Sequence, residues 1–421
     1  MSAAKAVVGR VWAGFVAPGT LSGVIFVVAA VVIALVFALP VHWSASSTIV
    51  VAQPGELFSL PNITLPTRST VLALAASCVA IGAFMSLRVR PRTHTVTVLV
   101  ALSLVMLAML VWAASGRSLQ LVDTLQLAFV SATPLILGSL GGVVSERAGA
   151  INVGIEGMML FGAFTGAIGA SLAGPTVGIL AAVVTGSLLG WLLGIGTIRF
   201  GINQIIAGIV MNIALLGVTD FFYNSVLVQY ANLNTFTPVG AINIPGLDDL
   251  PLIGPVLFEQ RIFFYVGVVL ALVLYVAFRR SRWGLRVHAV GENPHAADAA
   301  GIGVLRTRYQ NMAMSGAICG FAGAYLSIGL IGSFTLDMTD GIGYIALAVM
   351  IIGGWRPLGA LAAAALFGVF ESLQGAFATI GVPVASEFLQ MAPYVGTIVV
   401  VAGVVGTSRM PAADGQPFIK S

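Results

Sequence analysis

The feature that most constrains this chain is a series of apolar stretches of about twenty residues, which recur along its 421 residues. An α-helix needs about 20 residues to cross the roughly 30 Å of hydrocarbon in a bilayer. Only 8% of the residues are charged, against about 25% in soluble domains. So few charged groups cannot cover the surface of a soluble fold. The sequence therefore predicts an all-α polytopic integral membrane protein, and it excludes a soluble enzyme, a nucleic-acid binder and a disordered protein.

The loop charges orient the spans. Twelve candidate spans cover residues 21–43, 71–87, 95–114, 121–142, 151–173, 177–197, 202–223, 262–278, 311–333, 341–354, 358–380 and 390–406. A cytoplasmic N-terminus places 16 of the 19 basic residues inside, and leaves only Arg68, Arg117 and Arg261 outside. Because residues 341–354 are short and residues 145–157 are polar enough for a re-entrant or broken helix, we expect about 10–12 transmembrane helices, with both termini cytoplasmic.

No chemistry of a catalytic or metal site is visible in the sequence. Cys78 and Cys319 lie far apart in apolar stretches, and all four histidines fall in or beside loops. No catalytic pair or triad is found at membrane depth. The only lysines, Lys5 and Lys420, lie in the terminal tails, so the Lys of a Walker A loop is missing. We expect no cofactor and no metal on this chain, and an ATPase, if one drives it, on another polypeptide.

Polar residues inside the expected spans are the candidates for a substrate path, because such groups are costly in lipid and face a bundle interior or an aqueous route. Two of them lie four residues apart, on one face of a helix expected to begin near Ile151. Others form a stripe along the span 202–223. They either line a path or brace neighbouring helices. The candidates are Asn152, Glu156, Asn203, Gln204, Asn212 and Asp220. Of these, we expect Asn203 and Asn212 to face the path.

Residues 145–164, SERAGAINVGIEGMMLFGAF, resemble the permease subunits of ABC importers, in the branch shared by ribose-type sugars, branched-chain amino acids and nucleosides. Residues 201–221, 284–329 and 341–360 resemble the nucleoside-importer permeases most closely. The resemblance runs from about residue 121 to 407. It implies a permease core over 121–410, preceded by an N-terminal extension of about three transmembrane helices over 1–120 and followed by a cytoplasmic tail over 411–421.

The resemblance also implies a location in the cell and a set of partner proteins. Such permeases lie in the bacterial cytoplasmic membrane, pair with a second permease subunit that is typically a different chain, and receive substrate from an extracytoplasmic binding lipoprotein. A cytoplasmic ABC ATPase, which binds ATP and Mg, drives alternating access. Within the long cytoplasmic loop 279–310, the stretch GENPHAADAAG resembles the coupling helix that docks on this ATPase, although an ordinary solvated helix is the alternative. Asn293 can cap such a helix, and Pro294 suits its first turn. The residues expected to couple are Gly291, Glu292, Asn293, Pro294, Ala296, Ala297 and Gly301.

The function that these observations favour is the permease subunit of an ATP-dependent nucleoside importer, with no covalent chemistry of its own. One alternative is the permease subunit of the same type of ATP-dependent importer, with a simple sugar such as ribose as its substrate. The other is an ion-coupled secondary transporter, in which Glu156, Asp220 or Glu371 would relay protons. Paired broken helices in an inverted repeat would favour that second alternative, but no internal repeat is evident.

Overall fold

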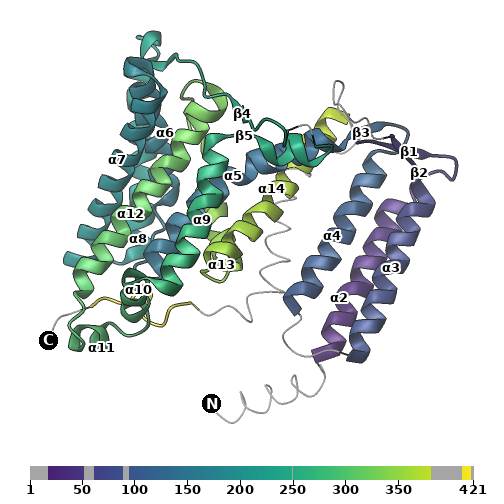
Figure 1. Ribbon diagram of the computed structural model, residues 1–421, viewed down its shortest axis with the longest axis horizontal. Helices are drawn as coiled ribbons and strands as arrows, with labels where there is room; N and C mark the ends of the chain where they lie inside the picture. Colours follow the sequence, from purple (N-terminus) through teal and green to yellow (C-terminus); the bar gives the residue numbers. More distant parts are fainter. Residues whose placement is uncertain (1–17, 52–60, 89–93, 249, 381–409, 419–421) are drawn as a thin grey trace. The chain divides into compact units, whose positions relative to one another are not determined.

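The computed structural model describes residues 18–51, 61–88, 94–248, 250–380 and 410–418 (Figure 1). The chain divides into two compact units. The first comprises Met1–Leu125, Asp249–Leu252 and Glu371–Thr407, and the second comprises Gln126–Asp248, Ile253–Phe370 and Ser408–Ser421.

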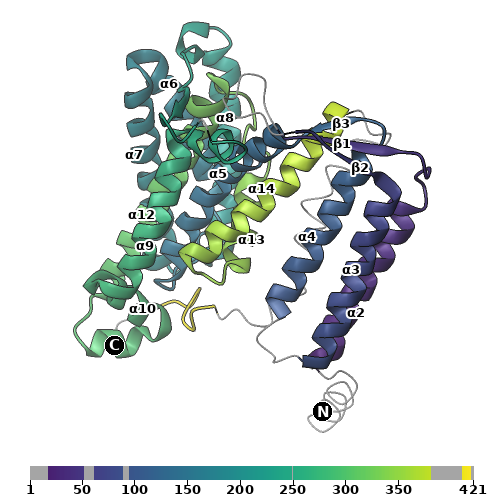
Figure 2. The ribbon, with the colours of Figure 1, turned by 45° about the vertical axis from the view of Figure 1, so that its right-hand side comes forward.

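Three helices form most of the described part of the first unit. They are α2 (Pro18–Val32), which a π-helical segment continues to Ala38, α3 (Thr67–Arg88) and α4 (His94–Ala113). The three lie side by side in Figures 1 and 2. Their facing sides bury Phe26, Ile33, Val71, Cys78 and Val111, and this apolar surface holds the helices together.

A small sheet closes one end of this unit. Strand β1 (Ser46–Val50) pairs antiparallel with β2 (Ile63–Pro66) and parallel with β3 (Ser118–Gln120). The buried Ser47 hydroxyl donates to the Val111 carbonyl oxygen, 2.6 Å away, and lies 2.6 Å from the Thr67 hydroxyl. This side chain therefore ties the sheet to α3 and α4.

The second unit is a larger helical bundle. Its apolar helices are α5 (Leu121–Glu146, from Gln126 onward), α6 (Ile155–Ala173), α7 (Pro175–Gly194), α8 (Gln204–Phe222), α9 (Ile262–Arg280), α12 (Val304–Ala324), the shorter α13 (Ile342–Ile352) and α14 (Pro357–Ile380, as far as Phe370). Pi-helical segments extend α7 to Arg199, α8 to Leu227 and α12 to Ile331. The short elements are a 3₁₀ turn (Ala231–Asn234), β4 (Ala241–Asn243), a π-helical turn (Gly254–Phe258), β5 (Glu259–Arg261), α10 (Arg282–Glu292) and α11 (Pro294–Ala299).

Glycines allow α7 and α12 to pack closely. A methyl group on Gly186 would lie 2.2 Å from the Gly316 carbonyl oxygen, and one on Gly320 would lie 2.1 Å from the Ala182 carbonyl oxygen. Such contacts are typical of small residues spaced four apart on membrane helices. The core around this contact includes Met158, Met312 and Tyr325.

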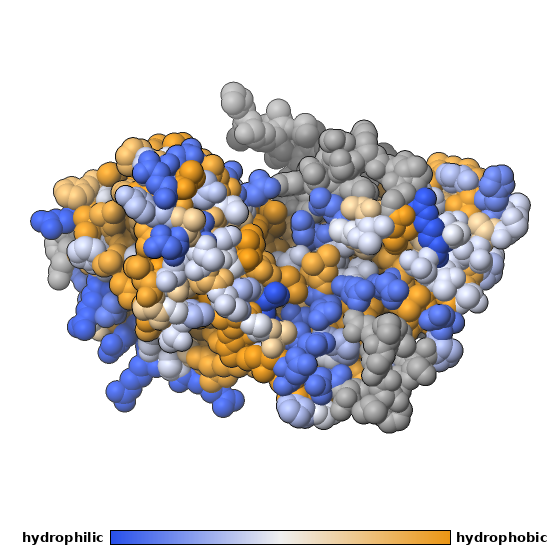
Figure 3. Space-filling view, turned by 90° about the horizontal axis from the view of Figure 1, so that it is seen from above, coloured by the Kyte–Doolittle hydropathy of each residue, from blue (hydrophilic) through white to orange (hydrophobic). Residues whose placement is uncertain are grey.

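Eight helices in the described part of the chain are long and apolar enough to cross a membrane. Three shorter apolar helices, Val24–Ala38, Ser103–Ala113 and Ile342–Ile352, accompany them. Eleven of the twelve expected spans coincide with a helix, and the twelfth, 390–406, lies outside the described residues. The face seen in Figure 3 mixes hydrophilic and hydrophobic residues, as expected where loops meet water at the ends of apolar helices.

Candidate substrate path and coupling segment

Residues 147–154 form a turn between two separate spanning helices, α5 and α6, where the polarity of residues 145–157 favours a re-entrant or broken helix. Alpha-helix α5 ends at Glu146, and α6 begins at Ile155. In the intervening turn, the amides of Ala148 and Ala150 both donate to the Ser145 carbonyl oxygen. Gly149 has a φ of +76°, which side chains rarely tolerate, so glycine suits this position. We call residues 147–154 the interhelical turn.

The prediction that a helix begins near Ile151 is wrong, and Asn152 therefore shares no helical face with Glu156. Asn152 lies in the interhelical turn and is fully buried. Its side-chain oxygen accepts from the Gly154 amide at 3.0 Å, a local turn that competes with helix formation. Its amide group donates to the Ser315 hydroxyl on α12, 2.9 Å away. Asn152 thus stops the helix and attaches the turn to α12.

Two side chains of α8 satisfy backbone groups around the turn. Gln204 Oε1 accepts from the Ile151 amide at 2.6 Å. Asn212 Oδ1 accepts from the Gly157 amide, and Asn212 Nδ2 donates to the Val153 carbonyl oxygen, both at 2.9 Å. Because buried backbone groups need partners where no helix supplies them, these two side chains brace the interruption.

Glu156 holds the start of another helix. Its two carboxylate oxygens accept from the amides of Gly341 and Gly343, the first at 2.9 Å, at the N-terminus of α13. A carboxylate is stabilised there by the free N–H groups and by the helix dipole. Glu156 as a whole is 8% exposed. Tyr344, also on α13, accepts at its hydroxyl from Asn212 Nδ2 at 3.1 Å.

The remaining two candidates lie apart from this group. Asn203 is exposed and caps α8, with Oδ1 accepting from the amides of Ile205 and Ile206. Asp220 is exposed near the other end of α8. There, burial and the negative charges of Asp340 and Asp220 raise the pKa of Asp337, which lies in the loop before α13. The structure thus gathers Asn152, Glu156, Gln204 and Asn212 at one place, and leaves Asn203 and Asp220 at the two ends of α8.

Sequence reasoning missed Ser315, Tyr344 and Asp337. Ser315 and Tyr344 belong to spans in which a single hydroxyl is unremarkable, and they meet Asn152 and Asn212 only through tertiary packing. Asp337 lies in a short connection whose acidic residues, Asp337 and Asp340, could have been compared with Asp220 at the predicted outer end of α8.

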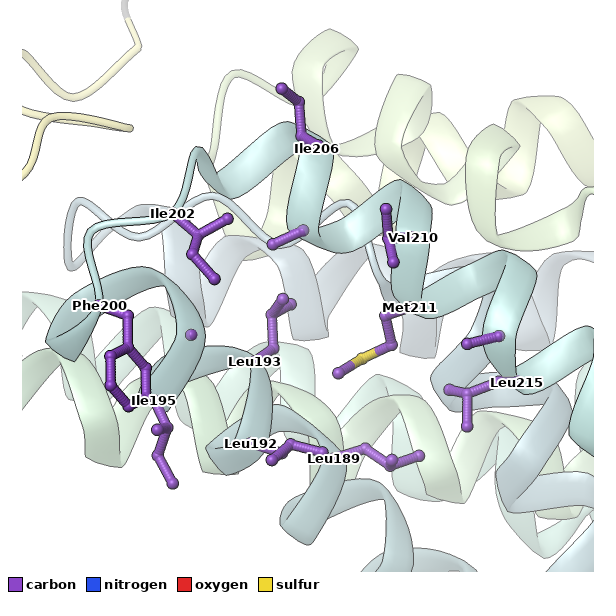
Figure 4. Close-up of a pocket in the computed structure, with 13 residues that line it drawn as sticks. Leu189, Leu192, Leu193, Ile195, Phe200, Ile202, Ile206, Val210, Met211 and Leu215 are labelled. Carbon is purple, nitrogen blue, oxygen red and sulfur yellow. The ribbon is translucent and has the colours of Figure 1, made fainter.

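A pocket of about 470 Å³ opens between α7, its π-helical extension and α8 (Figure 4). Its 13 lining residues are apolar and include Leu193, Phe200, Ile206 and Met211. Pockets for polar small molecules combine apolar walls with a few convergent hydrogen-bonding groups. This pocket lacks those groups, so it does not fit a polar substrate.

The loop 279–310, which the sequence predicts to be cytoplasmic, contains two short helices, α10 and α11. Asn293 caps α11, with Oδ1 accepting from the Ala296 amide at 3.0 Å, and Pro294 occupies the first helical position, as the sequence predicts. The buried side of the loop includes Gly291, Pro294 and Ala297. The exposed side of the loop carries Glu292, Asn293, His295, Ala296, Ala299, Ala300 and Gly301.

The two glycines of this loop have different structural roles. A methyl group on Gly291 would lie 2.2 Å from the Arg147 carbonyl oxygen, so Gly291 permits α10 to contact the interhelical turn. Gly301 has a φ of +80° and open space around it, so it ends the α11 segment with a left-handed residue. Burial and the positive charge of Arg356 lower the pKa of Arg147 at this contact, while Glu292 opposes the shift.

Comparison with known proteins gives the family. Residues 124–402 match the family described as branched-chain amino acid transport system / permease component. The chain belongs to this family. It is 38% identical over 323 residues to the nucleoside ABC transporter permease protein NupC of Lactococcus lactis subsp. cremoris, covering 72% of this chain and 100% of that protein. No solved structure matches the chain.

Two further relatives extend the comparison. The guanosine ABC transporter permease protein NupQ of Bacillus subtilis is 35% identical over 69% of this chain and 94% of its own length. The putative glucose ABC transporter permease protein TsgC13 of Haloferax volcanii is 35% identical over 58% of this chain and 74% of its own length. The chain is thus a multi-pass ABC transporter permease, a transport subunit that acts with an ATPase and a substrate-binding partner.

Proposed function

We propose that this chain is the permease subunit of an ATP-dependent nucleoside importer in a bacterial cytoplasmic membrane. The observation that carries the proposal is the 38% identity to a nucleoside permease over that protein's whole length. A second permease chain, an extracytoplasmic binding lipoprotein and a cytoplasmic ATPase complete the machine. This ATPase binds ATP and Mg, so the present chain needs no cofactor and carries no catalytic site of its own.

The polar group around the interhelical turn supports a substrate path beside it. The side chains of Asn152, Gln204 and Asn212 gather at the buried turn between the spanning helices α5 and α6. Polar groups in a membrane bundle typically face its interior or an aqueous route. The amides and carboxylates proposed to meet cargo, which also include Glu156, Asn203 and Asp220, can pair with ribose hydroxyls and base edges. Movement of this turn during alternating access would expose the path to each side in turn.

Alpha-helix α11 is the proposed coupling helix. Its exposed face carries alanines at 296, 299 and 300, which permit close approach of a partner, beside the exposed Glu292. Arginine at Ala296 should block docking and uncouple ATP hydrolysis from transport. Gln310→Arg, which adds the same charge at an exposed position of α12, is the matched control. Undiminished transport by Ala296→Arg would refute the coupling role.

A simple sugar is the second candidate cargo, because a putative glucose permease is 35% identical to this chain. Uptake of labelled guanosine, other nucleosides, glucose and ribose should be measured in cells that express this chain with the transporter subunits encoded beside it. An ATPase-dead variant is the control. Nucleoside uptake lost in the control supports the proposal, and sugar uptake alone supports the second candidate. Nucleoside uptake that survives in the control would instead indicate ion coupling.

A further inference from the structure

Residues 411–418, which we call the C-terminal strap, pack closely against the rest of the second unit. Pro411, Ala413, Asp414 and Phe418 are buried. The strap lacks the repeated hydrogen bonds of a helix or strand. Its backbone and side chains instead contact α5, the interhelical turn, α10, α11 and α12. These contacts connect the proposed coupling segment to the interhelical turn.

The first contacts are with the coupling segment. The Ala413 amide donates to the Gly291 carbonyl oxygen, 2.8 Å away, at the end of α10. The Phe418 ring centroid lies 5.1 Å from that of His295 on α11. Phe418 is buried in one apolar cluster with Val290, Ala297 and Val304. The inner side of α11 is therefore packed against the strap.

The second contacts are with the interhelical turn. The Arg308 guanidinium on α12, 1% exposed, donates to the Gln416 carbonyl oxygen at 2.7 Å and to the Ala413 carbonyl oxygen at 3.4 Å. A methyl group on Gly149 would lie 2.9 Å from Arg308 Nη2 and 3.1 Å from the Ala413 carbonyl oxygen. Gly149 belongs to the turn that Asn152 attaches to α12. One segment thus touches both the coupling helix and the turn beside the proposed path.

A pair of carboxyl groups lies at the centre of the strap. Asp414 adjoins Glu146, the last residue of α5. Asp414 is 6% exposed and Glu146 is 5% exposed. Trp355 Nε1 donates to Glu146 Oε2 at 2.6 Å. The charged groups that act on Asp414 are Glu146 from α5 and Arg308 from α12. Two adjoining buried carboxyl groups cannot both ionise without a large cost, so the pair shares a proton when the strap is docked.

We propose that the C-terminal strap positions coupling helix α11 and transmits its movement to the interhelical turn, and that protonation of the Glu146–Asp414 pair favours the docked strap. The proposal rests on the coupling role proposed for α11. The strap has the required connections, because it is bonded to Gly291 at the coupling segment and is held by Arg308 against Gly149.

Because docking of the strap is favoured by protonation of this pair, docking should weaken as the pH rises. Burial raises the pKa of Asp414 to about 7, although the positive charge of Arg308 lowers it. An undocked, solvated Asp414 would ionise near its ordinary value of 3.8. At a pH between 3.8 and about 7, Asp414 therefore takes up a proton when the strap docks. Loss of this one proton lowers the docking equilibrium constant by up to about 100-fold as the pH rises from 5 to 8.

Amide hydrogen exchange measures docking directly in the purified, full-length transporter complex. Protection of residues 411–418, corrected for the intrinsic rate at each pH, should fall up to about 100-fold from pH 5 to pH 8. Asp414→Asn keeps the shape of the neutral carboxyl and supplies an N–H to Glu146. Its protection should stay high at pH 8. Protection that is independent of pH in the unmodified chain would overturn the proton requirement.

Phe418→Ala tests the transmission of movement, because it removes the apolar anchor on α11. In reconstituted transporter, this variant should lose protection over 411–418 and lower the substrate imported per ATP hydrolysed by at least about tenfold. Met410→Ala is the matched control, because Met410 lies just before the strap with a side chain 51% exposed. Asp414→Asn should import as much substrate per ATP at pH 8 as the unmodified chain does at pH 6.

The outcomes separate this inference from the function on which it rests. If Ala296→Arg uncouples transport while Phe418→Ala does not, the coupling role of α11 stands and the strap inference is overturned. If Ala296→Arg transports normally, the coupling role fails, and the strap inference fails with it. Loss of coupling in both variants, with normal coupling in Met410→Ala, supports the inference.

Discussion

Replacing Asn212 with alanine removes the side chain that spans the interruption between α5 and α6. The change deletes the acceptor of the Gly157 amide, the donor to the Val153 carbonyl oxygen and the donor to the Tyr344 hydroxyl. Asn212 is 5% exposed, so water cannot readily replace these partners. A buried polar group left without a partner costs about 1–3 kcal/mol, and side-chain hydrogen bonds between membrane helices lie near the lower end of that range.

Two backbone groups lose a partner at once, so Asn212→Ala should destabilise the protein by about 2–4 kcal/mol. That is a large fraction of the roughly 5–15 kcal/mol that stabilises a typical folded protein. Thermal unfolding in lipid nanodiscs should show an apparent Tm several degrees lower. Uptake should fall together with stability, because the interhelical turn would lose its attachment to α8.

Asn203→Ala is the chemically matched control. Asn203 makes the same kind of bond to backbone amides, but it is exposed at the N-terminus of α8, so its loss should cost about 1 kcal/mol. An unchanged Tm for Asn212→Ala, together with reduced uptake, would refute the bracing role. That result would instead assign Asn212 to direct contact with cargo.

Three further perturbations test separate parts of the structure. Gly320→Ala should destabilise the chain by about 1–3 kcal/mol, because the new methyl group would lie 2.1 Å from a carbonyl oxygen of α7. Gly217→Ala is the control in the same thermal unfolding experiment and should cause no such loss, because open space surrounds Gly217. Trp355→Phe removes the N–H donor to Glu146 and should lower stability by about 1–3 kcal/mol, and an unchanged Tm would contradict that bond. Because the pKa of Asp414 is raised in the folded protein, the unmodified chain should become less stable as the pH rises from about 4 to 7. Unfolding measured at a series of pH values should show this dependence, and Asp414→Asn should flatten it.

The amino-acid sequence by itself determined the features that depend on neighbouring residues. Apolar runs of membrane-spanning length predicted eleven described helices, because the bilayer imposes the same length on each span. Asn293 and Pro294 predicted the start of α11, since capping involves groups only three residues apart. The polarity of residues 145–157 favoured a re-entrant or broken helix, whereas the structure has a turn between two separate spanning helices, with Asn152 in the turn.

Only the tertiary structure decided what the polar side chains do. Gln204 and Asn212 bind backbone groups more than 50 residues away along the sequence. Asp414 adjoins Glu146, although the two residues lie near opposite ends of the second unit's sequence. Helical periodicity predicts the face on which a residue lies, but it does not identify the partner on that face. These partners are selected when distant helices pack, because each buried hydrogen-bonding group must then find the complementary group that packing brings within reach.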